Sequence, residues 1–480
     1  MNRILNIFWF RKDLRIKDNK ALKYFIEGQN PEDKFCIVYI KNPDTYNFYG
    51  EKRVTFLLES LIELKTELKK FKLNLQILYG KSDKVFAKIS EFYSPVNIYC
   101  NAQIEPYSLK RDDLVKNILK SVGGSFNVYA DTTIFDFNRI KTATCKPYTI
   151  FTPFRKKLLA LINDNSCKSI EVNPGKLNKK SEIKLDFVDK YNPENDHNKY
   201  NSVNLIEGGR NKAIKKLKEF TKQKLMKYHH DRDYPAKPST SLLSPHIHFG
   251  TISIRECFRE AFKITGDFNT CWINELIWRE FYYNITYHFP YIIKKSFKEK
   301  YDSLTWDNNE NKFKKWKEGL TGYPIVDAGM RQLNQEGWMH NRVRMITAMF
   351  LVKDLLIDWR WGENYFAENL TDLDFSLNNG GWQWSASTGC DAQPYFRIFN
   401  PELQSRKYDP EGIYIKKYLP ELGNVKSKHI HNPSAMNKSE QISSNCIIGK
   451  NYPQPIVSHS KAKEEAISRF KNITNKFTNK

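Results

Sequence analysis

The sequence lacks several features that mark common protein classes. Its eight cysteines form no Cys-x-x-Cys pair and its ten histidines are scattered, so we expect neither a disulfide framework nor a metal site. No run of 18 or more apolar residues occurs, and charged residues break the short apolar stretch at the start, which argues against a membrane-spanning helix or a signal peptide. We therefore expect a cytoplasmic protein with reduced thiols and no membrane partner.

Acidic residues are scarce relative to basic ones. Lys and Arg number 77 against 54 Asp and Glu, which gives a net charge of +23 and a pI near 9.4. Charge of this sign favours an anionic partner such as nucleic acid. A coding bias towards Lys, Asn and Ile would produce the same excess, so the charge alone leaves nucleic-acid binding open.

The first part of the chain alternates strand and helix patterns. Apolar runs with β-branched or aromatic residues occur at 5–10, 35–40, 75–79 and 96–100. They predict an α/β domain with a doubly wound parallel sheet over residues 1–130, although no G-x-G-x-x-G marks an ordinary dinucleotide fold. Polar sequence predicts a connection over 131–204, and helical periods predict an all-α domain over 205–475.

Tryptophan is concentrated in one part of the chain. Nine of the ten tryptophans lie between Trp272 and Trp384, and the stretch 378–389 contains two of them with no recognisable helical or strand period. Cores built only for stability favour Leu, Ile and Val. The cluster therefore indicates redox or stacking chemistry.

Two expected helices combine polar and aromatic side chains on one face. On the first helix a sector of about 120° contains Trp272, Glu275, Trp278 and Arg279. On the second helix one face carries Asn341, Arg344 and Met345. A half-buried salt bridge beside core aromatics explains one such helix, but two favour a cavity for a flat polar ligand.

Hydroxyl and carboxylate groups add candidate ligand contacts. Ser244 followed by Pro245 predicts a helix N-cap with proline at the first helical position, and two hydroxyl-bearing residues lie just upstream. Such a helix start holds phosphate in some proteins and nothing in most. Asp372 and Asp374 either accept hydrogen bonds from a ligand or cap a helix.

Five motifs spread over the whole chain resemble those of the photolyase/cryptochrome family. They are WFRKDLR at 9–15, NELIWREF at 274–281, TGYPIVDA at 321–328, GWMHNRVRM at 337–345 and NNGGWQW at 378–384. The chain is most similar to class I cyclobutane pyrimidine dimer photolyases. The resemblance implies a monomer with an N-terminal α/β domain, a connection and an all-α C-terminal domain that holds FAD bent into a U.

The resemblance also implies the cofactor-binding residues. FAD would be held by Tyr228, Thr240, Ser241, Leu242, Leu243, Ser244, Trp272, Arg344, Asp372, Leu373, Asp374 and Asn378. Asn378 would face the flavin N5 atom. A neutral amide there is typical of repair enzymes, whereas plant cryptochromes carry an acid and animal ones a cysteine.

The implied activity is that of a carbon–carbon lyase acting on UV-damaged DNA, duplex or single-stranded, with no protein partner required. Excited reduced FAD would pass an electron to a pyrimidine dimer flipped out of the helix, as photolyases in general require, and the electron would return after the ring splits. Glu275 would hydrogen-bond the damaged bases. The residues implied to contact DNA are Arg232, Glu275, Trp278, Arg279, Asn341, Arg342, Met345, Trp384, Arg397 and Gln404.

Three tryptophans correspond to the family's chain of electron carriers. Trp382, Trp359 and Trp306 would carry an electron from the surface to oxidised flavin under light. Trp316 and Trp361 match no such role, and we expect them to be structural.

The sequence does not determine which antenna pigment is bound, or whether one is bound at all. Folate-binding relatives carry an Asn-Glu pair where this chain has Tyr107 and Ser108, and a lysine where it has Ile293. Methenyltetrahydrofolate held differently, a deazaflavin, a second flavin and no antenna at all are the alternatives.

Two other functions also remain open. A cryptochrome-like photoreceptor would bind FAD without repairing DNA, although Asn378 and Met345 favour repair. A single-stranded nucleic-acid binder that stacks bases on tryptophan would have no cofactor and no colour.

Overall fold

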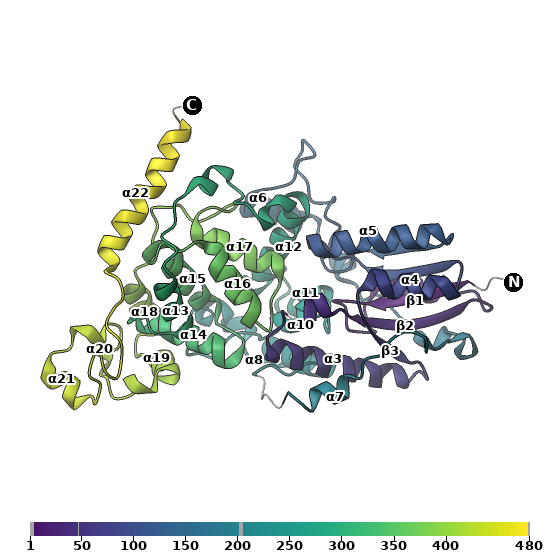
Figure 1. Cartoon of the computed structure of the whole chain (residues 1–480), viewed down its shortest axis with the longest axis horizontal. Coiled ribbons are helices and arrows are strands. Elements are labelled where there is room, and N and C mark those ends of the chain that lie inside the picture. Colours follow the sequence, from purple (N-terminus) through teal and green to yellow (C-terminus); the bar gives the residue numbers. More distant parts are fainter. Residues whose placement is uncertain (1–3, 47, 201–204, 479–480) are drawn as a thin grey trace. The chain divides into compact units, whose positions relative to one another are not determined.

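The computed structural model describes residues 4–46, 48–200 and 205–478, and the chain forms two compact units (Figure 1). The N-terminal unit comprises residues 1–226 and 241–288, and the C-terminal unit comprises 227–240 and 289–480. The domain boundaries inferred from the sequence stay a prediction. Among the described helices none has the length and apolar character needed to cross a membrane.

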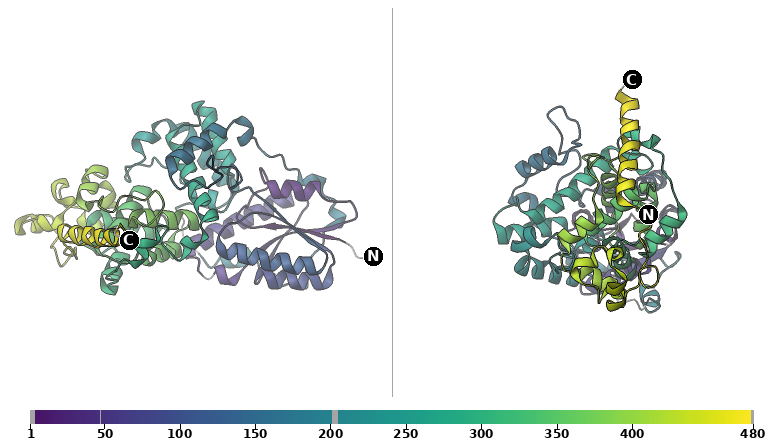
Figure 2. Two further views of the ribbon diagram at one scale, coloured as in Figure 1. Left: turned by 90° about the horizontal axis from the view of Figure 1, so that it is seen from above. Right: turned by 90° about the vertical axis from the view of Figure 1, so that its left-hand side faces the viewer.

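A five-stranded parallel sheet forms the centre of the N-terminal unit. Its strands are β1 (Leu5–Phe10), β2 (Lys34–Lys41), β3 (Leu75–Tyr79), β4 (Val96–Asn101) and β5 (Ser125–Tyr129), in the order β3-β2-β1-β4-β5. β1 is buried along its whole length because it lies in the middle of the sheet, and helices flank the sheet on both sides (Figure 2). The predicted doubly wound sheet is confirmed.

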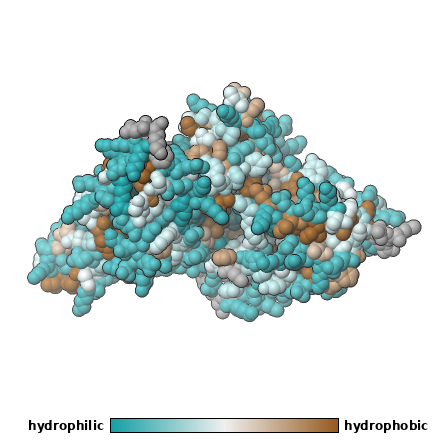
Figure 3. Space-filling model, turned by 45° about the horizontal axis from the view of Figure 1, so that its top comes forward, coloured by the Kyte–Doolittle hydropathy of each residue, from teal (hydrophilic) through white to brown (hydrophobic). Residues whose placement is uncertain are grey.

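Amphipathic helices surround this sheet and continue beyond it. The helices of the N-terminal unit are α1 (Lys20–Glu27), α2 (Pro43–Tyr46), α3 (Glu51–Lys69), α4 (Ser82–Phe92), α5 (Pro106–Ser121), α6 (Phe151–Leu161), α7 (Pro193–His197), α8 (Arg210–Gln223), α10 (Ser244–His248), α11 (Ile254–Thr265) and α12 (Cys271–His288). In α3 the predicted leucine stripe is buried, at Leu57, Leu61, Leu64 and Leu68. Figure 3 shows one face of the molecule, on which hydrophilic residues predominate and hydrophobic residues form separate patches.

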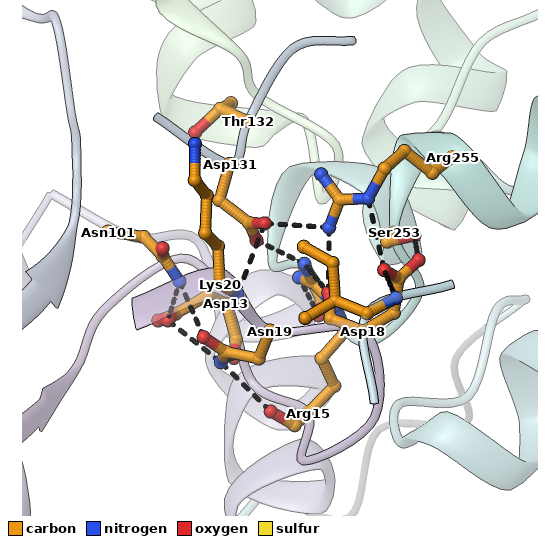
Figure 4. A network of polar contacts seen from close by, with 12 residues as sticks. Asp13, Arg15, Asp18, Asn19, Lys20, Asn101, Asp131, Thr132, Ser253 and Arg255 are labelled. Carbon is orange, nitrogen blue, oxygen red and sulfur yellow. Dashed lines mark hydrogen bonds and ion pairs between the residues drawn. The ribbon is translucent and has the colours of Figure 1, made fainter. Parts of the chain in front are cut away.

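A buried network of charges joins the sheet to α11 (Figure 4). Arg255 donates to Asp18 at 3.0 Å and to Asp131 at 2.7 Å, and Arg15 donates to the same Asp131. Burial alone would raise the pKa of Asp131, but the two guanidinium groups hold that pKa below its ordinary value. Ser253 caps α11 in the capping box expected from the sequence and also donates to Asp18. The network fixes α11 against the loop that follows β1.

Helices joined by turns and loops make up the described part of the C-terminal unit. Its helices are α9 (Tyr228–Asp231), α13 (Glu310–Glu318), α14 (Pro324–Glu336), α15 (Asn341–Met349), α16 (Trp359–Asn369), α17 (Phe375–Ala386), α18 (Pro401–Tyr408), α19 (Ile413–Tyr418), α20 (Ser427–Ile430), α21 (Lys438–Ser443) and α22 (His459–Thr478), with a π-helical turn, η7 (Phe350–Asp354), after α15. One core cluster contains Trp316, Trp359 and Trp382. The predicted all-α character is confirmed.

The stretch 378–389, expected to lack regular structure, forms most of α17 instead. Asp374 caps this helix by accepting hydrogen bonds from the backbone N–H groups of Ser376 and Leu377. Two adjacent glycines weaken helix propensity by about 1 kcal/mol each, which hid the periodicity. The cap and the burial of Trp382, which is 2% exposed, stabilise the helix against that cost.

The assignment of Ser244 as a helix N-cap is wrong by one position. Helix α10 begins at Ser244, and Leu243 occupies the N-cap without a side-chain cap. Pro245 consequently occupies the second helical position and not the first, and a missing N–H costs nothing at either position because both lie in the first turn. Just upstream, Leu242 has a φ of +54°, a left-handed conformation that is costly for a bulky side chain.

Candidate functional site

Helix α12 presents the predicted carboxylate and aromatic groups in the N-terminal unit. Glu275 and Trp278 are half-buried, whereas Trp272 is 3% exposed and packs on the ring of Phe220 at 4.8 Å. The ring of Trp278 lies parallel to that of Phe151, with centroids 3.6 Å apart. Phe151 therefore covers one face of this indole, and Tyr282 makes a second stacked contact with it at 5.7 Å.

Arg279 has a different setting from its helical neighbours. It is 5% exposed, donates to the carbonyl oxygen of Thr132 at 2.8 Å and lies 4.2 Å above the ring of Tyr283. Its guanidinium therefore holds the segment after β5, while its assignment to DNA binding stays a prediction.

In the C-terminal unit, α15 is tied to the start of α17. Arg344 donates to both carboxylate oxygens of Asp372, at 2.9 and 3.1 Å, and to the carbonyl oxygen of Met339. His340 caps α15 by accepting from the N–H of Arg342, and burial lowers the pKa of His340 to about 4. The imidazole is therefore neutral at neutral pH, which its acceptor role requires.

Helix α17 aligns three predicted site residues. Asp374, Asn378 and Trp382 are separated by four residues each and so share one face. Asn378 Nδ2 donates to the carbonyl oxygen of Glu363 at 3.0 Å. This bond fixes the amide and leaves its oxygen, Oδ1, as the end that can accept a hydrogen bond from a ligand.

Glu363 is a site residue that nothing in the sequence singles out. Its backbone oxygen holds Asn378 and its carboxyl oxygen accepts from Asn379 at 3.0 Å. Burial raises the pKa of Glu363 to about 7. No motif or spacing signals this role, because the contact joins α16 to α17 through a backbone atom.

Cationic residues predicted to contact DNA differ in how they are held. Arg342 donates to Asp233 at 2.9 Å and lies 4.4 Å from the ring of Tyr408. Arg232 lies within 3.9 Å of the same Asp233. Arg397 is exposed. The first two arginines thus share one carboxylate, and the third presents its charge to solvent.

The remaining predicted DNA contacts lie in three places. Asn341 is exposed at the start of α15 and its amide approaches the Met345 sulfur at 3.8 Å. Trp384 is half-buried in α17. Gln404 is half-buried in α18, and its Oε1 atom is buried without a hydrogen-bond partner among the described residues.

The predicted phosphate-binding segment runs across the boundary between the two units. Tyr228 and Thr240 belong to the C-terminal unit, and residues 241–244 belong to the N-terminal unit. Ser241 Oγ accepts a hydrogen bond from the N–H of Leu243 at 3.4 Å, whereas Ser244 is exposed. Leu373 is half-buried between the two aspartates that precede α17.

The three tryptophans assigned to electron transfer share one hydrophobic core. Trp359 and Trp382 are 0% and 2% exposed, and the half-buried Trp306 packs against the same cluster. Within the described residues no direct ring contact joins these three. The ring neighbours of Trp382 are Phe366 at 5.0 Å and Trp316 at 6.1 Å.

Two of the predicted antenna positions, Tyr107 and Ser108, lie at the start of α5, and the third, Ile293, is half-buried at the end of a 3-10 turn (Pro290–Ile293) in the C-terminal unit. Tyr107 is 45% exposed, and its hydroxyl accepts a hydrogen bond from the amide of Asn42 at the end of β2. Ser108 donates to Gln103 at 3.3 Å. Both side chains are thus engaged within the N-terminal unit.

Comparisons with known proteins cover nearly the whole chain. The family model described as the FAD binding domain of DNA photolyase matches residues 272–472, and the DNA photolyase model matches residues 6–172. The Deoxyribodipyrimidine photo-lyase of Buchnera aphidicola is 38% identical over 97% of this chain and 96% of its own length.

Solved structures give the same result. A bacterial class III photolyase from Agrobacterium tumefaciens has a TM-score of 0.88 and 34% identity, covering 99% of this chain and 98% of its own. An archaeal photolyase from Sulfolobus tokodaii, solved with two FAD molecules, has a TM-score of 0.83 and 33% identity, covering 98% of this chain and 100% of its own. The chain therefore belongs to the DNA photolyase family.

Proposed function

We propose that this chain is a light-driven DNA repair enzyme that splits cyclobutane pyrimidine dimers with FAD as its cofactor. The observation that carries the proposal is the match over 97% of the chain to relatives called Deoxyribodipyrimidine photo-lyase. The presence of an amide at Asn378 and of a carboxylate at Glu275 supports repair as the use of the fold. UV-damaged DNA is the proposed partner.

The donors and acceptors of the C-terminal unit suit a flavin dinucleotide. Asp372 and Asp374 supply carboxylate oxygens that accept from N–H groups or ribose hydroxyls, and Arg344 holds the first of them in place. We assign the phosphates to the hydroxyl-bearing segment 240–244. Tyr228, Trp272 and Leu373 complete the proposed set of FAD contacts.

Bound FAD, when reduced and excited, supplies the electron that opens the dimer. The protein's task is to keep the cofactor in that state and to hold the substrate. With its Nδ2 atom committed to Glu363, Asn378 offers Oδ1, an acceptor suited to the N–H that a flavin N5 atom carries only when reduced. The amide thereby favours the reduced form over the oxidised one.

We assign two substrate contacts to α12, the carboxyl group of Glu275 and the indole of Trp278, and they have different roles. Glu275 accepts or donates a hydrogen bond at the damaged bases, steadying the extra charge on the opened ring. The half-buried Trp278, held by Phe151 and Tyr282, supplies an apolar wall beside the dimer. Arg232, Arg342 and Arg397 neutralise backbone phosphates without reading sequence.

The test uses full-length protein purified in the dark. Its absorbance from the near-ultraviolet to the blue, before and after denaturation, shows whether flavin and a second pigment are bound. Chemically reduced protein is then illuminated with an oligonucleotide that contains one thymine dimer. Restoration of the thymines is expected, and intact dimers after saturating illumination would contradict the proposal; a flavoprotein of that kind would instead be a photoreceptor.

The role of Glu275 is tested separately. We expect Glu275→Ala to keep FAD and DNA binding while lowering the yield of dimer splitting about tenfold, the effect of losing about 1.4 kcal/mol of transition-state stabilisation. Glu260→Ala on α11, which removes a carboxylate paired with Lys263, is the matched control and should repair normally. An unchanged yield in Glu275→Ala would remove Glu275 from the mechanism.

A further inference from the structure

Trp316 and Trp361, which match no role in the sequence motifs, belong to a continuous aromatic path. Trp316 contacts Phe313 in a stacked arrangement at 5.8 Å, and Phe313 contacts Trp361 edge-on at 5.2 Å. At its other end, Trp316 meets Trp382 edge-on at 6.1 Å. We call Trp316, Phe313 and Trp361 the aromatic branch. It connects the buried face of α17 to the half-buried indole of Trp361 on α16.

The branch is the route on which ring contacts are continuous. Electron exchange between side chains falls off steeply with separation, so a neighbour in ring contact is favoured over one that is not. Trp382 has a tryptophan in ring contact in Trp316, while no ring contact links it to Trp359 within the described part of the chain. On the basis of ring contacts alone, Trp316 therefore competes with Trp359 as the residue that donates an electron to oxidised Trp382.

The surroundings of the two indoles also favour a positive charge on Trp316. Its Nε1–H donates to the carbonyl oxygen of Thr347 at 3.1 Å, and this acceptor stabilises an indole that has lost an electron. Trp359 instead lies 4.6 Å below the guanidinium of Arg360, and its buried Nε1 has no partner among the described residues. The attraction between a cation and a neutral ring becomes repulsion once the ring is oxidised.

The carboxylates near Arg360 weaken its repulsion of a positive charge on Trp359 but do not make the surroundings of Trp359 as favourable as those of Trp316. Arg360 is paired with Asp358 at 3.1 Å and with Asp302 at 2.9 Å, so part of its charge is neutralised. Arg360 is also partly exposed, and water screens it further. The missing acceptor at Nε1 of Trp359 is independent of that screening, because this atom is buried.

We propose that the aromatic branch is a second electron-transfer route, running from Trp361 through Trp316 to Trp382. The proposal rests on the proposed function, since it requires an oxidised flavin as the acceptor. One electron leaves Trp382 for that acceptor, Trp316 refills Trp382, and Trp361 refills Trp316. Phe313 is too hard to oxidise to hold the charge and serves as the contact between the two indoles. A dissolved thiol, the one-electron reductant, then refills Trp361.

Trp361 rather than Tyr365 is the end of the branch. Tyr365 also contacts Trp316, at 5.9 Å, but oxidised tyrosine must release its phenolic proton. Its hydroxyl donates to the amide oxygen of Asn334 at 2.7 Å, which is too weak a base to take that proton. The ammonium of Lys317 lies 5.6 Å from the same ring and opposes positive charge there. The half-buried Trp361 can exchange its N–H proton with water.

The experiment blocks the electron-transfer route through Trp359 and then detects the tryptophan radical that remains. In the oxidised holoenzyme carrying Trp359→Phe, flash photolysis should still show a long-lived tryptophan radical, and steady illumination with a thiol should still reduce the flavin. Adding Trp316→Phe should abolish both signals, and adding Trp361→Phe should shorten the radical's lifetime and prevent its reduction by the thiol. Electron paramagnetic resonance with deuterated tryptophan identifies the radical independently of repair.

Controls separate the branch from folding and from the proposed function. Trp316 is fully buried, so flavin retention is checked in each variant, and the half-buried Trp361 provides a second test with little loss of packing. Trp338→Phe is the matched control and should change neither signal. Loss of the radical in Trp359→Phe alone, its persistence after Trp316→Phe is added, or a tyrosyl radical would overturn the branch. Dimer repair by chemically reduced protein should survive in every variant, and its failure in the unmodified protein would contradict the proposed function instead.

Discussion

At the scale of single residues, burial decides how the carboxyl groups of this protein ionise. Glu280 on α12 is 4% exposed and accepts a hydrogen bond from the N–H of Ile134 at 3.0 Å. Burial raises the pKa of Glu280 to about 8, although the guanidinium of Arg279, 3.9 Å away, favours the charged form. At neutral pH this side chain is therefore mostly a neutral acid, unlike the paired Asp131.

This ionisation gives a prediction about stability and pH. A carboxyl group with a raised pKa in the folded state binds its proton more tightly there than in the unfolded chain, so its contribution is present at low pH. That contribution is lost as pH rises from the ordinary glutamate value to about 8. Glu280→Gln keeps an acceptor for Ile134 without a charge. We expect its free energy of unfolding, measured by denaturant titration, to equal that of the parent at pH about 5 and to exceed it by a few kcal/mol at pH about 8.

The control for this prediction is Glu260→Gln, because Glu260 lies in a surface pair with Lys263. That variant should follow the pH dependence of the parent. Equal stability of Glu280→Gln and the parent at both pH values would mean that Glu280 is ionised in the folded protein.

At the scale of secondary-structure elements, close approach between α16 and α17 depends on one glycine. A Cβ atom on Gly362 would lie 2.0 Å from the indole of Trp382 and 2.6 Å from a methyl group of Leu351. At Gly381 a Cβ atom would meet nothing within 4 Å, and the residue is exposed. The two helices therefore carry one glycine that packing requires and one that it does not.

These two glycines predict opposite effects of the same substitution. Gly381→Ala should raise the free energy of unfolding by about 0.5–1 kcal/mol, because it lowers the entropy of the unfolded chain and improves helix propensity. Gly362→Ala should lower it by about 1–3 kcal/mol and shift the fluorescence of Trp382, since the core must move apart. Thermal unfolding of both variants checks the pair. A stabilising Gly362→Ala would mean that the helices are not in contact there.

The elements also show which structure the sequence could predict. The strands β1 to β4 and the helix α12 follow from apolar runs and a sustained helical period, which local sequence displays directly. β5 is an edge strand with no buried residue, so no apolar run marks it. α17 was missed because its two adjacent glycines weaken the helical signal. Its cap, Asp374, is local, but the packing of Trp382 that stabilises the helix comes from distant parts of the chain.

The site is less accessible to sequence reasoning than the fold. Spacing correctly grouped Glu275 with Trp278 on α12, but only the family resemblance assigned them a role. The bond from Asn378 to a backbone oxygen of α16 and the contact of Trp316 with Trp382 depend on helix packing. Neither leaves a periodic signal, because backbone acceptors occur at every residue and the paired rings are far apart in sequence.

At the scale of the whole molecule, the net charge of +23 predicts how DNA binding responds to salt. Each phosphate neutralised on a duplex contributes about −0.9 to the slope of log K against log salt concentration. Arg397 is exposed, so Arg397→Ala should make this slope shallower by about 1. Arg342 is paired with Asp233 at 2.9 Å, and removing it leaves Arg232, 3.9 Å away, as the remaining arginine beside that carboxylate.

Arg342→Ala should therefore weaken binding at every salt concentration while changing the slope less than Arg397→Ala does, since its charge already has a counterion in the protein. Titration of a dimer-containing duplex at four or more salt concentrations, with both variants and the parent measured side by side, checks this order. Equal changes of slope would show that Arg342 leaves Asp233 when DNA binds. In that case the free energy of breaking the Arg342–Asp233 pair lowers the measured affinity, and Asp233→Asn should strengthen binding in the parent.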